Sequence, residues 1–286
     1  MVRVDGGLRG SLRLRGTRLQ WGAQTYVMGI VNVTPDSFSG DGVEQAPRAI
    51  ARAIEQSGAG ADLLDIGGES TRPGHQPVEA SFEIARIAPV IQAVRARLPD
   101  LPISVDTHKP AVLRAAHEAG ADLVNSVWGA SDELLALAAE LQTPIVAMHN
   151  QADTHYDGYV VDAVLRYLDE CATRATARGI PRDAVILDPG IGFGKTADQN
   201  LAVLQALDRI VALGFPTMIG ASRKSTIGKL TKREPADRVY GTVATTALAV
   251  RAGVDVVRVH DVAAARDAVA VADAIVRGWR PADWTK

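Results

Sequence analysis

The sequence predicts an α/β protein with the fold of a (β/α)8 barrel, also called a TIM barrel. Eight short apolar runs rich in β-branched residues recur along the 286 residues, and segments with helical spacing separate them. The runs are continuous rather than alternating, which is typical of parallel strands that are buried on both faces. Eight equal repeats of strand and helix favour the closed barrel over a doubly wound open sheet, which usually has fewer strands.

The eight expected strands follow one another without a linker or a change in composition. We therefore expect one domain over residues 1–286, with residues 1–23 as an N-terminal extension. Residues 11–21 (SLRLRGTRLQW) alternate apolar and polar side chains around "GT", which predicts a β-hairpin that caps the floor of the barrel. The expected strands are TYVMGIVN from Thr25, ADLLDIGG from Ala61, PISVDT from Pro102, ADLVNSVWG from Ala121, TPIVAMHN from Thr143, AVILDPG from Ala184, PTMIGASRK from Pro216 and VDVVRVHD from Val254.

Helical spacing is clear in two of the intervening segments. Residues 84–98 place Ile, Val and Leu on one apolar stripe, and residues 160–171 do the same. Cys171 falls on the second stripe, so we expect a small core residue rather than a nucleophile, with no basic neighbour to lower its thiol pKa. A glycine ends several helices just before the next strand, at Gly120, Gly179 and Gly253.

The composition excludes several classes of protein. With 31 Lys and Arg against 33 Asp and Glu, the net charge of -2 gives no broad basic field, so nucleic acid is not expected as a partner. One cysteine excludes an internal disulfide and fits a reducing compartment. The N-terminus has no apolar signal region, and no apolar stretch approaches the roughly 18 residues that span a membrane. We therefore expect a soluble, cytoplasmic protein without a membrane contact.

Polar side chains stand at the C-terminal ends of all eight expected strands. In a barrel these ends converge on one mouth, where the functional site lies. One polar strand end means little, but eight in succession predict a site. The residues are Asn32, Asp65, Asp106, Asn125, His149, Asp188, Lys224, and Arg258 with His260. The sequence leaves open whether Asp65 only braces the loop after its strand, and whether His149 is structural.

The residue types at these ends meet two chemical demands. Asp106, Asn125 and Asp188 suit a flat nitrogen heterocycle, because a buried carboxylate accepts two parallel hydrogen bonds from an edge of N–H donors. Basic side chains at and near these ends, together with Asn32, suit an anion such as a phosphate. We therefore expect a heterocycle deep in the site and an anion near its rim. The anion-binding side chains would be Asn32, Arg72, Arg223, Lys224, Arg258 and His260.

Six blocks of the sequence resemble those of the dihydropteroate synthases, in the same order and over nearly the whole chain. They are MGIVNVTPDSFS, DIGGESTRPG, SVDT, DPGIGFGK, SRKS and RVHDV. The resemblance implies a transferase of folate synthesis, which joins 6-hydroxymethyl-7,8-dihydropterin pyrophosphate to p-aminobenzoate and yields 7,8-dihydropteroate and pyrophosphate. It also implies Mg2+ as cofactor, a homodimer, and sulfonamides as inhibitors. The sequence leaves open whether this is a sulfonamide-sensitive or a resistant form.

The resemblance also assigns roles to the matching positions. The pterin would be bound by Asp106, Asn125, Met148, Asp188 and Lys224. The pyrophosphate would be bound by Asn32, Arg72, Arg258 and His260, with Asn32 as the protein ligand of Mg2+. The p-aminobenzoate would be bound by Phe38, Thr71, Arg72, Pro73, Phe193 and Ser222. Catalysis would depend on Asn32, Asp106, Asp188, Lys224, Arg258 and His260.

The polar stretch NVTPDSFSGDG, residues 32–42, suits neither a strand nor a helix. By the resemblance it is a loop that closes over the diphosphate and places Phe38 against the aminobenzoate ring. The amine of p-aminobenzoate is a weak nucleophile, so ionisation of the pterin C–O bond before attack, an SN1-like order, is expected. No covalent enzyme intermediate is needed, in agreement with the lack of a Ser–His or Cys–His arrangement.

The chain departs from the family pattern at two places. Asp41 follows Gly40 in SFSGDG, where the family has SFSDGG, and Ser126 stands where the family has an aspartate. Two other function classes stay open as alternatives: a methyltetrahydrofolate:corrinoid methyltransferase and a non-catalytic pterin-binding paralogue. The blocks STRPG, SRKS and RVHDV argue against the first. The intact anion-site residues argue against the second.

Overall fold

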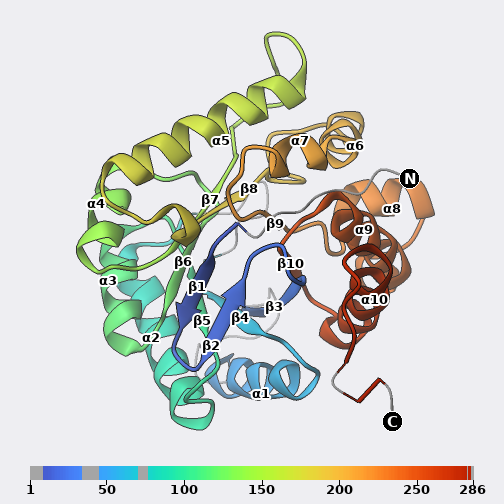
Figure 1. Cartoon of the computed structure of the whole chain (residues 1–286). Coiled ribbons are helices and arrows are strands. Elements are labelled where there is room, and N and C mark those ends of the chain that lie inside the picture. Colours follow the sequence, from blue (N-terminus) through green and yellow to red (C-terminus); the bar gives the residue numbers. More distant parts are fainter. Residues whose placement is uncertain (1–8, 34–44, 70–76, 282, 285–286) are drawn as a thin grey trace.

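A computed structural model describes residues 9–33, 45–69, 77–281 and 283–284. Each of the eight predicted runs forms a strand of one parallel barrel (Figure 1). The strands are β3 (Tyr26–Asn32), β4 (Leu63–Gly67), β5 (Ile103–Asp106), β6 (Leu123–Ser126), β7 (Ile145–Met148), β8 (Val185–Asp188), β9 (Met218–Ile219) and β10 (Val256–Val259). Their order is β8-β7-β6-β5-β4-β3-β10-β9, and a bridge between Leu187 and Thr217 joins β8 to the segment leading into β9.

Helices surround the strands on the outside of the barrel (Figure 1). They are α1 (Gln45–Gly58), α2 (Ala80–Arg97), α3 (Pro110–Ala119), α4 (Asp132–Glu140), α5 (Val160–Ala177), α6 (Ala197–Gln205), α7 (Leu207–Val211), α8 (Ser225–Thr231), α9 (Val239–Ala252) and α10 (Val262–Val276), with short 3-10 helices at Arg182–Ala184 and Pro235–Asp237. Across the described ranges, none of these helices has the length and apolar character needed to cross a membrane.

The core forms because both faces of each strand are covered, by the barrel interior on one side and by helices on the other. Every residue of β5 and β7 is buried. The predicted stripe of α2 faces inward, with Ile87, Ile91 and Val94 fully buried. Cys171 on α5 is 2% exposed, and burial raises the pKa of its thiol, so it is a core residue as expected.

Glycine ends helices where the chain must turn into the next strand. Gly120 follows α3 with a φ of 110°, and Gly253 follows α9 with a φ of 95°. This left-handed conformation is open to glycine without steric cost, and in both cases the glycine N–H bonds to the last turn of the helix. The glycine signals in the sequence therefore mark these helix ends correctly.

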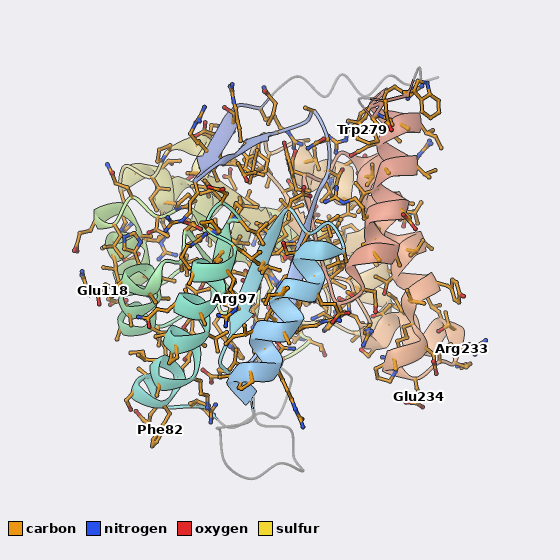
Figure 2. All side chains as sticks on the ribbon, turned by 90° about the horizontal axis from the view of Figure 1, so that it is seen from below. Phe82, Arg97, Glu118, Arg233, Glu234 and Trp279 are labelled. Carbon is orange, nitrogen blue, oxygen red and sulfur yellow. The ribbon has the colours of Figure 1, made fainter. Side chains whose placement is uncertain are left out.

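The predicted N-terminal hairpin pairs β1 (Ser11–Leu14) with β2 (Thr17–Gln20) in antiparallel register. It lies at the end of the barrel where the strands begin, which we call the floor, opposite the end labelled by Phe82 and Glu234 in Figure 2. The fully buried Trp21 donates its indole N–H to the carbonyl of Asp183, which precedes β8, at 2.9 Å. The hairpin thus caps the floor, as the sequence predicts.

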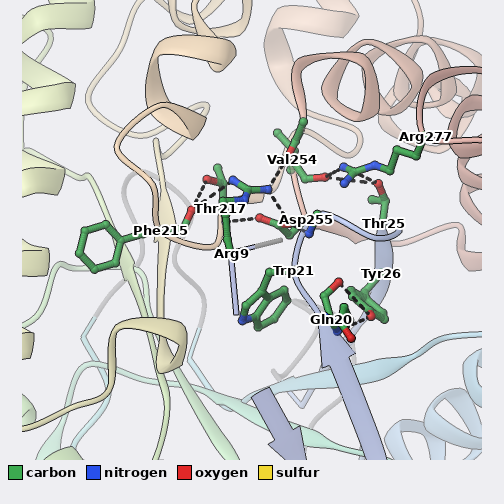
Figure 3. Close-up of polar contacts among 12 residues, drawn as sticks. Arg9, Gln20, Trp21, Thr25, Tyr26, Phe215, Thr217, Val254, Asp255 and Arg277 are labelled. Carbon is green, nitrogen blue, oxygen red and sulfur yellow. Dashed lines mark hydrogen bonds and ion pairs between the residues drawn. The ribbon is translucent and has the colours of Figure 1, made fainter. Parts of the chain in front are cut away.

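A buried aspartate at the floor binds the N-terminal segment to the barrel (Figure 3). Asp255, fully buried just before β10, has partners on both carboxylate oxygens. Oδ1 accepts from Nη2 of Arg9 at 2.6 Å and from the N–H of Gly22 at 2.9 Å, and Oδ2 accepts from the N–H of Thr217 at 2.9 Å. These bonds hold the hairpin in place.

Asp273 on α10 plays a similar part beside β3. Its Oδ2 accepts from the N–H of Thr25 at 2.6 Å, and its Oδ1 accepts from the hydroxyl of Thr25 at 3.0 Å. Nε of Arg277 lies 2.9 Å from Oδ1, and Nη2 of Arg277 donates to the carbonyl of Val254 at 2.7 Å. Both buried carboxylates at the floor therefore have all their oxygens engaged by the protein.

Candidate active site

The predicted site residues meet at the opposite end of the barrel, the mouth, where the parallel strands finish. Strand register places Asp106 beside Asn125, and Met148 beside Asp188. All four side chains are buried, whereas Asn32 is exposed at the end of β3. The convergence expected from the polar strand ends is therefore present in the structure.

The guanidinium of Arg258 connects strands across the mouth. From β10, its Nε donates to Oδ2 of Asp65 at 2.6 Å and its Nη2 donates to Oδ2 of Asp106 at 2.8 Å. The same oxygen of Asp65 accepts from Nδ2 of Asn125 at 2.9 Å. Asp65 is fully buried, so it orients two predicted site residues from β6 and β10 rather than serving only the loop after its own strand.

Three acceptor atoms in this cluster have no hydrogen-bond partner within the described ranges of the chain. They are Oδ1 of Asp65, Oδ1 of Asp106 and Oδ1 of Asn125, all of them buried. Leaving a buried polar atom unpaired costs about 1–3 kcal/mol, so such atoms are rare unless a ligand or water meets them. Burial raises the pKa of Asp106, and the positive charge of Arg258 opposes this shift.

Asp188 completes the acceptor side of the site from β8. Its Oδ1 accepts from the N–H of Gly190 at 2.7 Å, and its side chain is buried. Burial raises the pKa of Asp188 to about 6, although this hydrogen bond and the charges of Lys224 and Arg258 act in the opposite direction. The carboxyl group therefore remains ionised near neutral pH and accepts hydrogen bonds there.

Lys224 and Phe193 form a second, more open part of the mouth. Nζ of Lys224 lies 4.0 Å from the centre of the Phe193 ring, within the range of a cation–π contact. Lys224 precedes α8, and the residue before it, Arg223, has a φ of 58° and forms an ion pair with Asp261. Arg223 was predicted as an anion ligand. Its pairing with Asp261 through Nε and Nη2 anchors the loop that carries Lys224.

Ser222 and His260 are neighbours at the rim. The Ser222 hydroxyl accepts from the N–H of His260 at 3.1 Å and lies 3.1 Å from Nδ1 of the same residue. Burial lowers the pKa of His260 to about 4, with a further contribution from the charge of Arg258. Before an anion binds, His260 is therefore neutral at physiological pH and can offer it an N–H donor.

Part of the predicted site lies outside the described residues: Phe38, Thr71, Arg72 and Pro73, together with the Gly40–Asp41 departure. The other departure, Ser126, is described, and its hydroxyl donates to the carbonyl of Gly129 in the turn after β6. Ser126 is fully buried, so it supports this turn.

Among the described residues, no cluster of three or more His, Cys, Asp or Glu side chains could hold a metal ion. Mg2+ commonly takes one or two protein oxygens and completes its shell with water and substrate phosphates. The exposed amide of Asn32 at the mouth fits that pattern, because it offers one oxygen next to the expected position of the anion.

Comparison with known proteins decides between the function classes. A family model described as "Pterin binding enzyme" matches residues 28–260. The chain is 45% identical to the dihydropteroate synthase of Synechocystis over 275 residues, which cover 92% of this chain and 93% of that protein. It belongs to the dihydropteroate synthase family. The recognition made from six sequence blocks is thus confirmed.

Solved dihydropteroate synthases share the fold. The enzyme of Xanthomonas albilineans with 4-aminobenzoic acid has a TM-score of 0.88 at 45% identity and covers 95% of this chain and 100% of its own. The enzyme of Clostridium difficile with pteroic acid has a TM-score of 0.86 at 42% identity and covers 90% and 98%. These relatives are synthases, and nothing in the comparison favours the corrinoid methyltransferase alternative.

The sequence analysis gave no role to one buried residue of the synthase mouth, Lys195. It ends the block DPGIGFGK, lies 8% exposed, and approaches Nδ1 of His149 to 2.8 Å. A lysine that closes a glycine-rich loop after a barrel strand is a signal that could have identified it. The contact between Lys195 and His149 could not be predicted from the sequence, because the two residues follow different strands.

Proposed function

We propose that this chain condenses 6-hydroxymethyl-7,8-dihydropterin pyrophosphate with p-aminobenzoate, releasing pyrophosphate and forming 7,8-dihydropteroate. The observation that carries the proposal is the set of buried, unpaired acceptors on Asp106 and Asn125 beside the acceptor Asp188. A pterin presents ring N–H and amino donors along one edge, which matches this set. The synthase of Thermus thermophilus has been solved with 6HMPPP, which supports the same substrate here.

The pterin would lie deep in the mouth. Asp106, Asn125 and Asp188 would accept its hydrogen bonds, and the buried Met148, which pairs in register with Asp188, would line the pocket. Lys224 would bind from the open side. Carboxylates close to the ring favour positive charge on it, so they would stabilise the cation that develops as the C–O bond ionises in an SN1-like step.

The diphosphate would lie toward the rim, bound by Asn32, Arg258 and His260, together with Arg72. A guanidinium has five N–H donors, and the described contacts of Arg258 to side chains use Nε and Nη2 for Asp65 and Asp106. Its other donors remain for an anion, so Arg258 would link the pterin and diphosphate ends. When bound at Asn32, Mg2+ would neutralise negative charge on the departing diphosphate.

The p-aminobenzoate would bind at the open part of the mouth. Phe193 and Ser222 would contact it, with Phe38, Thr71, Arg72 and Pro73 supplied by the two loops outside the described residues. The synthase of Yersinia pestis has been solved with a sulfonamide drug, and we propose that sulfonamides would compete for the same position here.

We propose a homodimer formed through α9 and α10. Tyr240, Leu248, Val271 and Ile275 project from these helices and are each at least 61% exposed. Exposed apolar side chains on two helices that pack against each other favour a protein partner. Light scattering should give twice the chain mass for the wild type and a single chain mass for Ile275→Asp.

For location we propose the cytoplasm, which agrees with the single, buried Cys171.

Release of pyrophosphate tests the proposed reaction. Pyrophosphate release should require both substrates and Mg2+. A sulfonamide that binds at the p-aminobenzoate position should suppress this p-aminobenzoate-dependent release. Asp106→Asn should lower turnover at least about thirtyfold, whereas Asp169→Asn, at an exposed position of α5, serves as the matched control and should be as active as the wild type. Pyrophosphate release that did not depend on p-aminobenzoate would contradict the proposal.

A further inference from the structure

The amine of Lys195 forms a three-way contact that the proposed reaction does not use. Lys195 lies in the loop between β8 and α6, and its Nζ lies 2.8 Å from Nδ1 of His149. It also donates to the carbonyls of Gly190 and Phe193, each at 3.0 Å. Burial lowers the pKa of Lys195 to about 7. In its protonated form the amine has three N–H donors, and each of them has an acceptor here. One side chain thus joins the end of β7 to two points of the β8–α6 loop.

The two carbonyls belong to residues at opposite parts of the site. Gly190 donates its N–H to Oδ1 of Asp188, in the proposed pterin pocket, at 2.7 Å. The ring of Phe193 lies beneath Nζ of Lys224, in the proposed aminobenzoate pocket. A backbone hydrogen bond from the N–H of Phe193 to the carbonyl of Gly190 at 3.2 Å already joins these two residues. Lys195 adds a second connection, which also holds the Phe193 carbonyl and ties both residues to His149.

Aromatic contacts hold the ring of His149, the acceptor of the Lys195 amine, in a fixed position. Its ring stacks on Tyr156 with a centroid distance of 6.1 Å and meets the edge of Tyr167 at 4.9 Å. Tyr156 in turn donates its hydroxyl to the carbonyl of Gly194 at 2.7 Å. Burial, followed by the charge of Lys195, lowers the pKa of His149 to about 3, so the imidazole is neutral and accepts at Nδ1.

The environment of Lys195 differs from that of Lys109, a lysine that is only partly buried. Lys109 pairs with two carboxylates, Glu69 at 2.5 Å and Glu83 at 2.6 Å, which is the usual way to stabilise a buried ammonium. The three acceptors of Lys195 are an imidazole and two carbonyls, all neutral. Burial without a carboxylate partner costs stability, so an ion pair does not account for the position of Lys195.

We propose that Lys195 is a positioning residue that sets the Phe193 wall of the aminobenzoate pocket relative to the pterin pocket. The inference rests on the proposed function. Without Lys195, the N–H of Gly190 would still bind Asp188, which β8 also holds in place. The Phe193 carbonyl would lose its described donor, so the aminobenzoate end should be affected more than the pterin end.

Steady-state kinetics of Lys195→Met tests this inference. Methionine has a similar volume and no donor. The KM for p-aminobenzoate should rise about tenfold, while the KM for the pterin diphosphate should stay within about twofold. Lys229→Met, at an exposed position of α8, is the matched control and should change neither constant. A variant that was merely less well folded would lower kcat without separating the two KM values.

Lys195→Gln provides a second, milder variant, because its amide keeps two N–H donors for the two carbonyls. Its KM for p-aminobenzoate should lie between those of the wild type and Lys195→Met. Equal rises in both KM values, or no rise in either, would overturn the inference while leaving the proposed reaction intact. A wild-type protein without turnover would instead overturn the proposed reaction.

Discussion

The two ends of the barrel use the same residue types in opposite ways. At the floor, Asp255 and Asp273 are buried beside arginines, and every carboxylate oxygen meets a donor from the protein. At the mouth, Asp65 and Asp106 are buried beside Arg258, and each keeps one oxygen that no described residue of the protein meets. The aspartates at the two ends are alike in burial and charge. They differ in whether every carboxylate oxygen accepts a hydrogen bond from the described part of the protein.

This difference separates a structural ion cluster from a binding one. A cluster whose carboxylate oxygens all meet protein donors holds chain segments together, here the N-terminal hairpin and the start of β10. A partly satisfied cluster is costly by itself and becomes favourable only when a ligand supplies the missing donors. The charged residues at the floor should therefore affect stability, and those at the mouth should affect binding.

The largest expected effect is at the floor. Asp255→Ala should lower the free energy of unfolding by about 3–5 kcal/mol, because Arg9 is left as a buried charge without its partner and two N–H groups lose their acceptor. Urea denaturation measures this change. Both KM values of the folded fraction should stay at the wild-type level. A decrease in the free energy of unfolding below about 1 kcal/mol would contradict the structural role assigned to the floor cluster.

The next effect is at the mouth. Asp106→Ala should lower kcat/KM for the pterin diphosphate about thirtyfold to a thousandfold. This corresponds to roughly 2–4 kcal/mol of lost stabilisation, because a buried charged acceptor is removed. Its free energy of unfolding should fall much less than that of Asp255→Ala, since Arg258 keeps Asp65 as a partner. Near-normal activity would contradict the assignment of the acceptors to the pterin.

A pair of phenylalanines extends the comparison to apolar groups. Phe38→Ala should raise the KM for p-aminobenzoate by about tenfold to a hundredfold, because the lost ring contact is worth on the order of 1–3 kcal/mol. Phe215→Ala, which removes a buried ring at the floor beneath Arg182, should lower the unfolding free energy without changing either KM. If Phe38→Ala left the aminobenzoate KM unchanged, Phe38 would have no part in the site.

The smallest effect is a dependence on pH. The pKa of Asp188 is raised to about 6, and only its ionised form accepts hydrogen bonds on both oxygens. As far as Asp188 sets it, the affinity for 6-hydroxymethylpterin should therefore be nearly full at pH 7, about half of that at pH 6 and about tenfold lower at pH 5. Calorimetry at several pH values measures it. Asp188→Asn should bind weakly at every pH and lack the inflection near pH 6, keeping only the dependence that comes from Asp106, whose pKa burial raises to about 7.

Much of the fold could be predicted from the sequence because its determinants are local. Continuous apolar runs mark strands buried on both faces, and alternation in residues 11–21 marks the hairpin. The mouth was also predictable, since parallel strands bring their last residues to one edge. Asp106 and Asn125 are neighbours there, as their places at adjacent strand ends predict.

The choice of partners at the mouth could not be predicted, because it depends on distances between side chains from different strands. Arg258 has polar neighbours on several strands, and only its position in the fold shows that it bonds to Asp65 and Asp106. The pairing of Arg223 with Asp261 and the contact of Lys195 with His149 arise in the same way. Residue type alone does not distinguish a paired cation from one that binds an anion.

Calorimetric titration of 6-hydroxymethylpterin into three proteins tests the central claim most directly. Wild type and Asp255→Asn, corrected for the folded fraction, should bind with the same Kd, whereas Asp106→Asn should bind at least about thirtyfold more weakly. Equal binding by Asp106→Asn, or a comparable loss in Asp255→Asn, would show that unpaired acceptors at the mouth do not distinguish the binding end of the barrel from the structural end.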